Sequence, residues 1–332
     1  MKLSICRRFS SQSVALILVL LLPAYCGELL SGSTPLKAYF LPVAFLCHTA
    51  LYGCGTLLIR ELSVRWGLRW SQIFLAIAYG VVEEGLCCKS FFDPNWKDLR
   101  GLNNYASLFG VQWAWTLLLI TVHMTLSTLI PIRIVDMLFP SLADRPLVGR
   151  RGMILAGLAF SAVVICGFIG FPFRLSLAKT VASLAVVAAL AWLAYTFRKS
   201  ENPVASLNKS KILKIPPILA VSALVLTTVT TFTPYLLSSF RFVPPAATVT
   251  AQVLILLMVA IFSLATICQN QIDFKRDSQF ILGCLSYWII TSFLQGNWMC
   301  IVGAVTIVLC VLWFIFSMRA NKAKELANSL VT

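Results

Sequence analysis

Apolar runs of about 18 to 25 residues recur from one end of the chain to the other, and each is long enough to cross the hydrocarbon core of a bilayer as a helix. Such runs leave few alternatives, because inside a membrane every backbone polar group must be bonded within the protein, and only helices and closed barrels achieve this. A barrel would show short segments of alternating polarity, which are not seen. The fold expected is an all-α, polytopic transmembrane helical bundle.

Composition supports the same class. Hydrophobic residues make up 59% of the chain and charged residues 12%, and the mean hydropathy of +0.87 lies outside the balance of a soluble domain. The net charge of +15 suggests nucleic-acid binding at first, but the basic residues are confined to particular loops, which is typical of topology determinants. We therefore expect membrane lipids and no nucleic acid as partners. The 11 cysteines form no CxxC pair, so neither a disulfide framework nor a zinc site is expected.

About ten spans are predicted within a single integral membrane domain that covers residues 1–332. The first is expected to remain as a helix rather than to be cleaved as a signal peptide, because Tyr25 is too large for a good cleavage site before Cys26. The predicted spans lie near 12–30, 36–58, 70–91, 107–132, 151–171, 174–197, 215–239, 246–268, 279–294 and 297–318.

Lysine and arginine gather in alternate connections between these spans, and the set that is rich in them is expected to face the cytoplasm. This places both termini in the cytoplasm and predicts a multi-pass protein of the plasma membrane. The cytoplasmic set comprises Arg7, Arg8, Arg60, Arg65, Arg69, Arg145, Arg150, Arg151, Arg198, Lys199, Lys209, Lys211, Lys214, Lys275, Arg276, Arg319, Lys322 and Lys324.

Two adjacent carboxylates, Glu83 and Glu84, interrupt the third apolar run in the stretch AYGVVEEGLCCKSFFDPNW. An ionised carboxylate near the bilayer centre costs roughly 2.5 to 3.5 kcal/mol, so such residues face the bundle interior and mark functional sites. Adjacent helical residues point about 100° apart, so one glutamate is expected to face a polar cavity while the other pairs with a neighbour such as Lys89. The sequence Asp93-Pro94-Asn95 is expected to end the helix.

His123 lies near the middle of the fourth run, on one helical face with Gln112, Thr116 and Ser127. Spans three and four are joined by a single outer loop, and counting inward from it puts His123 at the depth of the glutamates. A carboxylate and an imidazole that meet there could activate water, with glutamate as the base. His48 in the second run is a candidate third group, and Asn297 is a further polar residue that could line a path.

These residues resemble the CPBP superfamily of intramembrane proteases, which includes CAAX-prenyl endopeptidases and bacteriocin-processing proteins. The matching residues are Glu83-Glu84, for the paired glutamate of EExxxR, and His123, for the histidine of FxxxH in the next helix. The resemblance covers roughly residues 70 to 130. It implies that Glu83 or Glu84 is the general base and that His123 helps to hold water and the oxyanion.

The chain departs from that pattern at three places. Cys88 stands at the arginine position, Leu119 replaces the phenylalanine, and no later histidine follows. The longer EEG…KSFFDPNW stretch also looks similar to a set of uncharacterised prokaryotic membrane proteins.

Three functions fit the sequence. The first is a glutamate-dependent intramembrane hydrolase with Glu83, Glu84 and His123 as catalytic residues, acting on a membrane-embedded peptide or a lipid-linked substrate. The second is a proton- or cation-coupled transporter that uses the same carboxylates, and the third is a non-catalytic scaffold or partner subunit in which the glutamates lock helices together. Residues expected to contribute to binding are Lys89, His48, Gln112, Ser127 and Asn297. No cofactor and no bound metal is predicted, because no HExxH-type pair, P-loop or GxGxxG is found.

Overall fold

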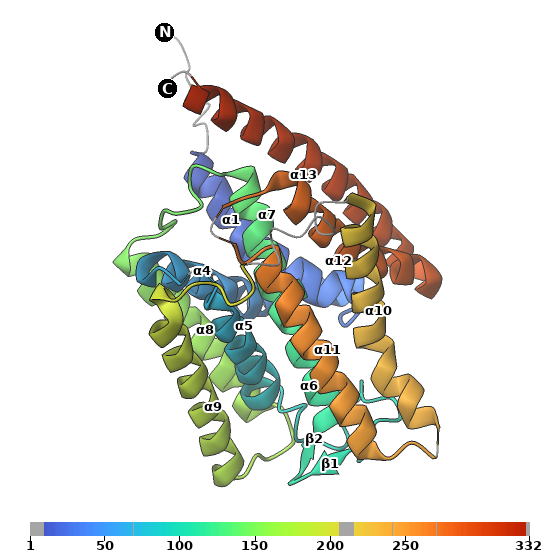
Figure 1. The fold of residues 1–332 in the computed structure, drawn as a ribbon. Helices are drawn as coiled ribbons and strands as arrows, with labels where there is room; N and C mark the ends of the chain where they lie inside the picture. Colours follow the sequence, from blue (N-terminus) through green and yellow to red (C-terminus); the bar gives the residue numbers. More distant parts are fainter. Residues whose placement is uncertain (1–9, 69, 206–215, 241, 270, 330–332) are drawn as a thin grey trace.

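The structure is a computed structural model that describes residues 10–68, 70–205, 216–240, 242–269 and 271–329. It is a bundle of helices (Figure 1) with one short hairpin, so the predicted all-α fold is confirmed. Part of the basic set used for the topology lies outside the described residues, namely Arg7, Arg8, Arg69, Lys209, Lys211 and Lys214. The start of α1 and the end of α13 lie at the same end of the bundle (Figure 1), as an even number of spans requires.

Among the described residues, eight helical stretches are long and apolar enough to cross a membrane. Two predicted spans are not among them. The third consists of a 9-residue helix, α5 (Gln72–Gly80), and the 7-residue η3 (Val81–Cys87), which together are short for a bilayer. The ninth corresponds to α12 (Phe274–Gln295), whose first turn is charged. The eight stretches are Ser11–Leu30, Pro42–Trp66, Trp113–Leu138, Arg150–Gly170, Leu177–Lys199, Ile218–Ser239, Pro245–Ala265 and Asn297–Ala320.

Several helices continue past the charged residues at which the sequence predicted that the chain leaves the membrane. The stretch predicted over 36–58 breaks after α2 (Leu36–Tyr39) and then runs through α3 (Pro42–His48), η2 (Thr49–Gly53) and α4 (Cys54–Trp66). Its Arg60 is buried because its guanidinium donates to the carboxylate of Asp136 at 3.1 and 3.2 Å. Burial of paired charges lets a helix extend where hydropathy alone predicts a loop.

The fourth span is the central helix of the bundle. It consists of α6 (Trp113–Val122), η4 (His123–Leu129) and α7 (Ile130–Leu138), and 78% of its most apolar window is buried. By contrast, α8 (Arg150–Gly170) and α9 (Leu177–Thr196) form a peripheral pair that packs on α4, α5 and η3 (Figure 1). Only 6% and 11% of the most apolar windows of these two spans are buried. Their outward apolar side chains suit contact with lipid.

The C-terminal half adds four long helices around this centre. They are α10 (Pro216–Ser239), α11 (Pro245–Ala265), α12 and α13 (Asn297–Ser329). Helices α10 and α11 pack on α6, and α12 lies between α10 and α13 (Figure 1). Arg133 of α7 ties α12 to the centre, because its Nη2 lies 2.5 Å from Oδ2 of Asp277, which is fully buried.

Four π-helical segments occur among the described residues, and all lie in the first four predicted spans. They are η1 (Tyr25–Leu30), η2, η3 and η4. A short segment, η5 (Phe197–Lys199), is of the 3-10 type. π-Helical turns are rare, and they are frequent at functional sites. The glutamate pair lies in η3 and His123 opens η4, so these turns place the residues that the sequence singled out.

The connection between η3 and the hairpin folds back over the end of the bundle. The helix ends at Cys87, earlier than Asp93-Pro94-Asn95, and Lys89 takes a left-handed conformation with φ 63°. An apolar cluster holds the connection in place, formed by Phe91, Phe92, Leu99, Leu102, Trp115 and Leu118. The hairpin of β1 (Ser107–Leu108) and β2 (Val111–Gln112) then leads into α6, with Ser107 opposite Gln112.

Candidate functional site

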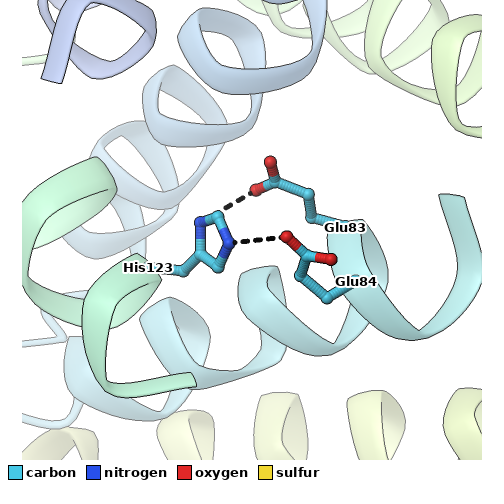
Figure 2. Close-up of side chains that lie close together, drawn as sticks. All are labelled: Glu83, Glu84 and His123. Atoms are coloured by element: carbon cyan, nitrogen blue, oxygen red, sulfur yellow. Dashed lines mark hydrogen bonds and ion pairs between the residues drawn. The ribbon is translucent and has the colours of Figure 1, made fainter. Parts of the chain in front are cut away.

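Glu83, Glu84 and His123 meet in the interior between η3 and η4 (Figure 2). Nε2 of His123 lies 3.1 Å from Oε1 of Glu84, within a hydrogen bond. Nδ1 is hydrogen-bonded to Oγ of Ser127 at 3.2 Å and lies 3.1 Å from Oε2 of Glu83, an ion-pair contact. One imidazole therefore faces a carboxylate on each of its ring nitrogens.

The π-helical turn explains how both glutamates reach the same ring. We expected only one to face a shared partner, because side chains of adjacent residues diverge by about 100° in an α-helix. In η3 the backbone amide of Cys88 donates to the carbonyl of Glu83 at 2.8 Å, a bond that spans five residues. The wider turn reduces the angle between neighbouring side chains. The expectation is corrected accordingly, since both carboxylates contact His123.

Burial differs among the three residues in a way that assigns them different surroundings. The side chain of Glu83 is 2% exposed and that of His123 5%, whereas Glu84 keeps 11%. A buried carboxylate is stable only when it is paired and hydrogen-bonded, and the imidazole provides the pairing here. Glu84 is thus the carboxylate with access to a molecule from outside, and Glu83 is the enclosed one.

Glu84 is held from its other side by one residue of the connection after η3 and one residue of α6. The hydroxyl of Ser90 donates to Oε2 of Glu84, and Nε1 of Trp115 donates to Oγ of Ser90 at 3.1 Å. Ser90 is fully buried. This chain of bonds orients the carboxylate toward His123. Sequence reasoning did not find Ser90 or Trp115, because nothing in their spacing distinguishes them from packing residues.

A second acidic group, Glu28 of η1, lies next to this cluster. Its carboxylate accepts hydrogen bonds from the hydroxyl of Tyr52, at 2.8 Å, and from the hydroxyl of Thr34. Nε2 of His48 lies 4.0 Å away. The sequence reasoning missed Glu28, although it is a lone carboxylate in an apolar run and so carried the same signal as Glu83.

His48 therefore lies with Glu28 rather than against the glutamate pair, and other residues expected to contribute to binding lie elsewhere. Nζ of Lys89 donates to the carbonyls of Phe168, Phe171 and Phe173 at 2.7 to 2.8 Å, at the end of α8. This corrects the expected pairing of Lys89 with a glutamate, since the left-handed turn directs its side chain to these carbonyls.

Gln112 and Asn297 are also remote from the cluster. The side-chain oxygen of Gln112 accepts from the amide of Asn104 at 3.1 Å and so supports the β1–β2 hairpin. Asn297 is exposed at the start of α13, with φ 51°. Of the residues expected to bind, Ser127 alone touches His123 in the described part of the chain.

The cluster has the donor types of a cation site. Glu83, Glu84 and His123 each offer one ligand atom, and these atoms lie within 4.8 Å of one another. Carboxylate oxygen and imidazole nitrogen suit Zn²⁺ and other first-row divalent ions. The two carboxylates face opposite nitrogens of one ring, however. This arrangement fits proton sharing better than ligation of one ion by all three side chains.

Comparison with known proteins places the chain in a broad class. The model of a family described as "Uncharacterized membrane protein family" matches residues 16–320. No curated protein and no solved structure matches the chain.

Proposed function

Because the chain belongs to this uncharacterised membrane protein family, we propose its activity from the site itself: it is a membrane-embedded hydrolase in which Glu84 and His123 activate water. The observation that carries the proposal is the 3.1 Å contact between Oε1 of Glu84 and Nε2 of His123, with Glu83 on the other ring nitrogen. A base that is hydrogen-bonded to its partner, with a third group orienting that partner, is the usual arrangement in hydrolytic sites.

The three residues divide the work. Glu84, the most accessible of them, takes a proton from water as the water oxygen attacks the carbonyl carbon of the substrate. His123 accepts that proton from Glu84 and donates it to the leaving amine or alkoxide. The substrate is thus split into a carboxylic acid, which gains the water oxygen, and an amine or alcohol, which gains the proton. Ser127 holds the imidazole through its hydrogen bond to Nδ1, and the charge of Glu83, 3.1 Å from Nδ1, stabilises the protonated form.

The substrate class follows from the surroundings. The site lies within a helical bundle whose outer helices are apolar, so a substrate that reaches it is embedded in the bilayer, either a membrane peptide or a lipid-linked molecule. The resemblance to CPBP proteases supports a peptide. It rests on Glu83, Glu84 and His123 alone, since Cys88 and Leu119 depart from that pattern.

A second candidate, a proton-coupled transporter, is favoured by one feature of the same site. With a carboxylate on each ring nitrogen, the imidazole can hold one proton in several positions within the buried cluster. Intramembrane glutamate–histidine groups of this kind serve proton relays in pumps and transporters.

The test uses protein reconstituted in bilayers and a pool of transmembrane peptides in heavy-oxygen water. Hydrolysis adds one labelled oxygen to each new C-terminus, which mass spectrometry detects. Glu84→Gln should give no labelled product, whereas Glu201→Gln, a change of an exposed carboxylate, should cleave like the wild type. Glu84-dependent proton uptake by proteoliposomes without any labelled product would replace the hydrolase with the transporter.

A further inference from the structure

Glu28, His48 and Tyr52 form a polar group that the proposed reaction does not use. Glu28 lies two residues before the end of η1, and Thr34, which bonds its carboxylate, belongs to the turn that follows. The side chains of Glu28 and His48 are 15% and 18% exposed, against 2% for Glu83. The ring of His48 stacks on that of Tyr39 at 5.2 Å, which holds the imidazole beside the carboxylate. This group is therefore more accessible than Glu83, which is enclosed.

Tyr52 connects this group to the buried cluster. Its hydroxyl donates to Oε1 of Glu28 and also interacts electrostatically with the carboxylate of Glu83. Its ring centroid lies 6.1 Å from that of His123. Tyr52 is 3% exposed, and a buried hydroxyl between two carboxylates can donate to either one in turn.

The backbone of η1 is shaped to let Tyr52 occupy this position. A Cβ at Gly27 would lie 2.5 Å from Cε1 of Tyr52 and 2.9 Å from Oγ of Ser127, closer than side chains pack. Glycine at this position lets η1, the tyrosine ring and η4 approach one another. The contact between the two polar groups is thus a result of close packing by residues from three helices.

We infer that Glu28 and Tyr52 form a proton relay that joins the turn after η1 to Glu83 and His123. A proton that reaches Glu28 converts its carboxylate to the acid. Glu28 then donates to the Tyr52 oxygen as the Tyr52 hydroxyl donates its own proton to Glu83, so that one proton moves and only O–H bonds change. Glu83 passes the proton to Nδ1 of His123, and reversal of these steps carries a proton outward. The inference rests on the proposed function only in that both require His123 to exchange protons.

The experiment follows the ring protons of His123 directly. The chain has two histidines, so selective isotope labelling in lipid nanodiscs gives two sets of imidazole signals. In the His48→Gln variant only the signals of His123 remain, which assigns them. The rate at which the His123 ring proton exchanges with D₂O is then measured without any substrate. Tyr52→Phe removes the relaying hydroxyl and should slow this exchange by about tenfold or more, as expected when one step of a proton path is lost.

Tyr79→Phe is the matched control. The ring of Tyr79 also lies 6.1 Å from that of His123 and is equally buried. Its hydroxyl, like that of Tyr52, interacts with the carboxylate of Glu83, but among the described residues no hydrogen bond joins it to Glu28. Its removal should leave the exchange rate within about twofold of the wild type. Glu28→Gln, which retains the shape of the acceptor, should slow exchange as Tyr52→Phe does and covers the case in which the tyrosine variant fails to fold.

Equal exchange rates in the wild type, Tyr52→Phe and Glu28→Gln would overturn the relay. Slowing by Tyr79→Phe to the same extent would also overturn it, because the effect would then not depend on a hydrogen bond to Glu28. Neither result bears on hydrolysis, which is decided separately by the labelled products of Glu84→Gln.

Discussion

Glu84 and His123 are 39 residues apart in the chain, yet Oε1 of the carboxylate lies 3.1 Å from Nε2 of the imidazole in the bundle interior. They come from consecutive antiparallel spans, and each is positioned by a π-helical turn. The contact is buried, but the side chain of Glu84 is partly exposed on one side. Substitutions of these two residues therefore distinguish a chemical role from a structural one.

Replacing Glu84 or Glu83 by glutamine should abolish activity and leave abundance and thermal stability largely intact. Replacing His123 by alanine should also abolish activity, but with a loss of stability, because it leaves both buried carboxylates without the imidazole. Glutamine keeps the shape and can still hydrogen-bond, but it cannot take a proton, and loss of a general base costs about 10²- to 10⁴-fold in rate. We expect Glu84→Gln to have the larger effect, since Glu84 is the accessible carboxylate. The measurements are turnover and melting temperature in the same lipid. Full activity of the glutamine variants would remove hydrolysis from consideration.

A helix lock would give the opposite pattern for the glutamine variants. Breaking a buried charged pair costs about 3 to 5 kcal/mol, so stability would fall together with function. That result would favour the scaffold over either chemical role.

The topology prediction places the outer hairpin and the loop before α8 on opposite sides of the membrane. Single cysteines at Asn103 and Asp144, both exposed in the structure, should be labelled by an impermeant reagent from outside and from inside, respectively. The labelling of each variant is compared with that of the unmodified chain, because 11 native cysteines are present. Labelling of both sites from one side would overturn the cytoplasmic placement of the termini.

Arg133→Met should destabilise the bundle by up to about 3 to 5 kcal/mol, because it removes one of the two arginines, Arg133 and Arg276, that pair with the fully buried Asp277. Unfolding by denaturant in detergent measures the loss of unfolding free energy. Combining Arg133→Met and Arg276→Met with Asp277→Leu should recover part of it, since the buried carboxylate and both of its arginine partners are then removed together. The exposed Lys199→Met serves as the control, and an equal loss in that variant would refute the interpretation.

Gly53→Ala should destabilise the protein by about 1 to 3 kcal/mol through overpacking. A Cβ there would lie 2.1 Å from the carbonyl oxygen of Leu20, which is backbone and cannot move aside easily. Gly157→Ala, in the middle of α8 with nothing within 4 Å of its Cβ, should be neutral or stabilising by up to about 1 kcal/mol, because alanine favours helix over glycine. The two melting temperatures should move in opposite directions; a shared direction would contradict the packing argument.

The sequence by itself determined the class of the protein and the most unusual residues in it. Long apolar runs force a helical membrane bundle, because the backbone has no other way to satisfy its polar groups in lipid. The same cost of burying charge drew attention to Glu83, Glu84 and His123 before their contact was visible. These inferences need only local composition and the depth of a residue in its run.

Tertiary structure decided what depends on partners far away in the chain. The helices that carry Arg60 and Arg133 extend past their predicted ends because Asp136 and Asp277 pair with these arginines. Lys89 donates to a carbonyl at the end of α8 instead of pairing with a glutamate. The π-helical turns bring both Glu83 and Glu84 to one ring and set Glu28 beside Tyr52. Hydropathy and helical spacing treat each span alone, whereas the pairing of buried charges and the winding of a turn are set by the side chains packed around them.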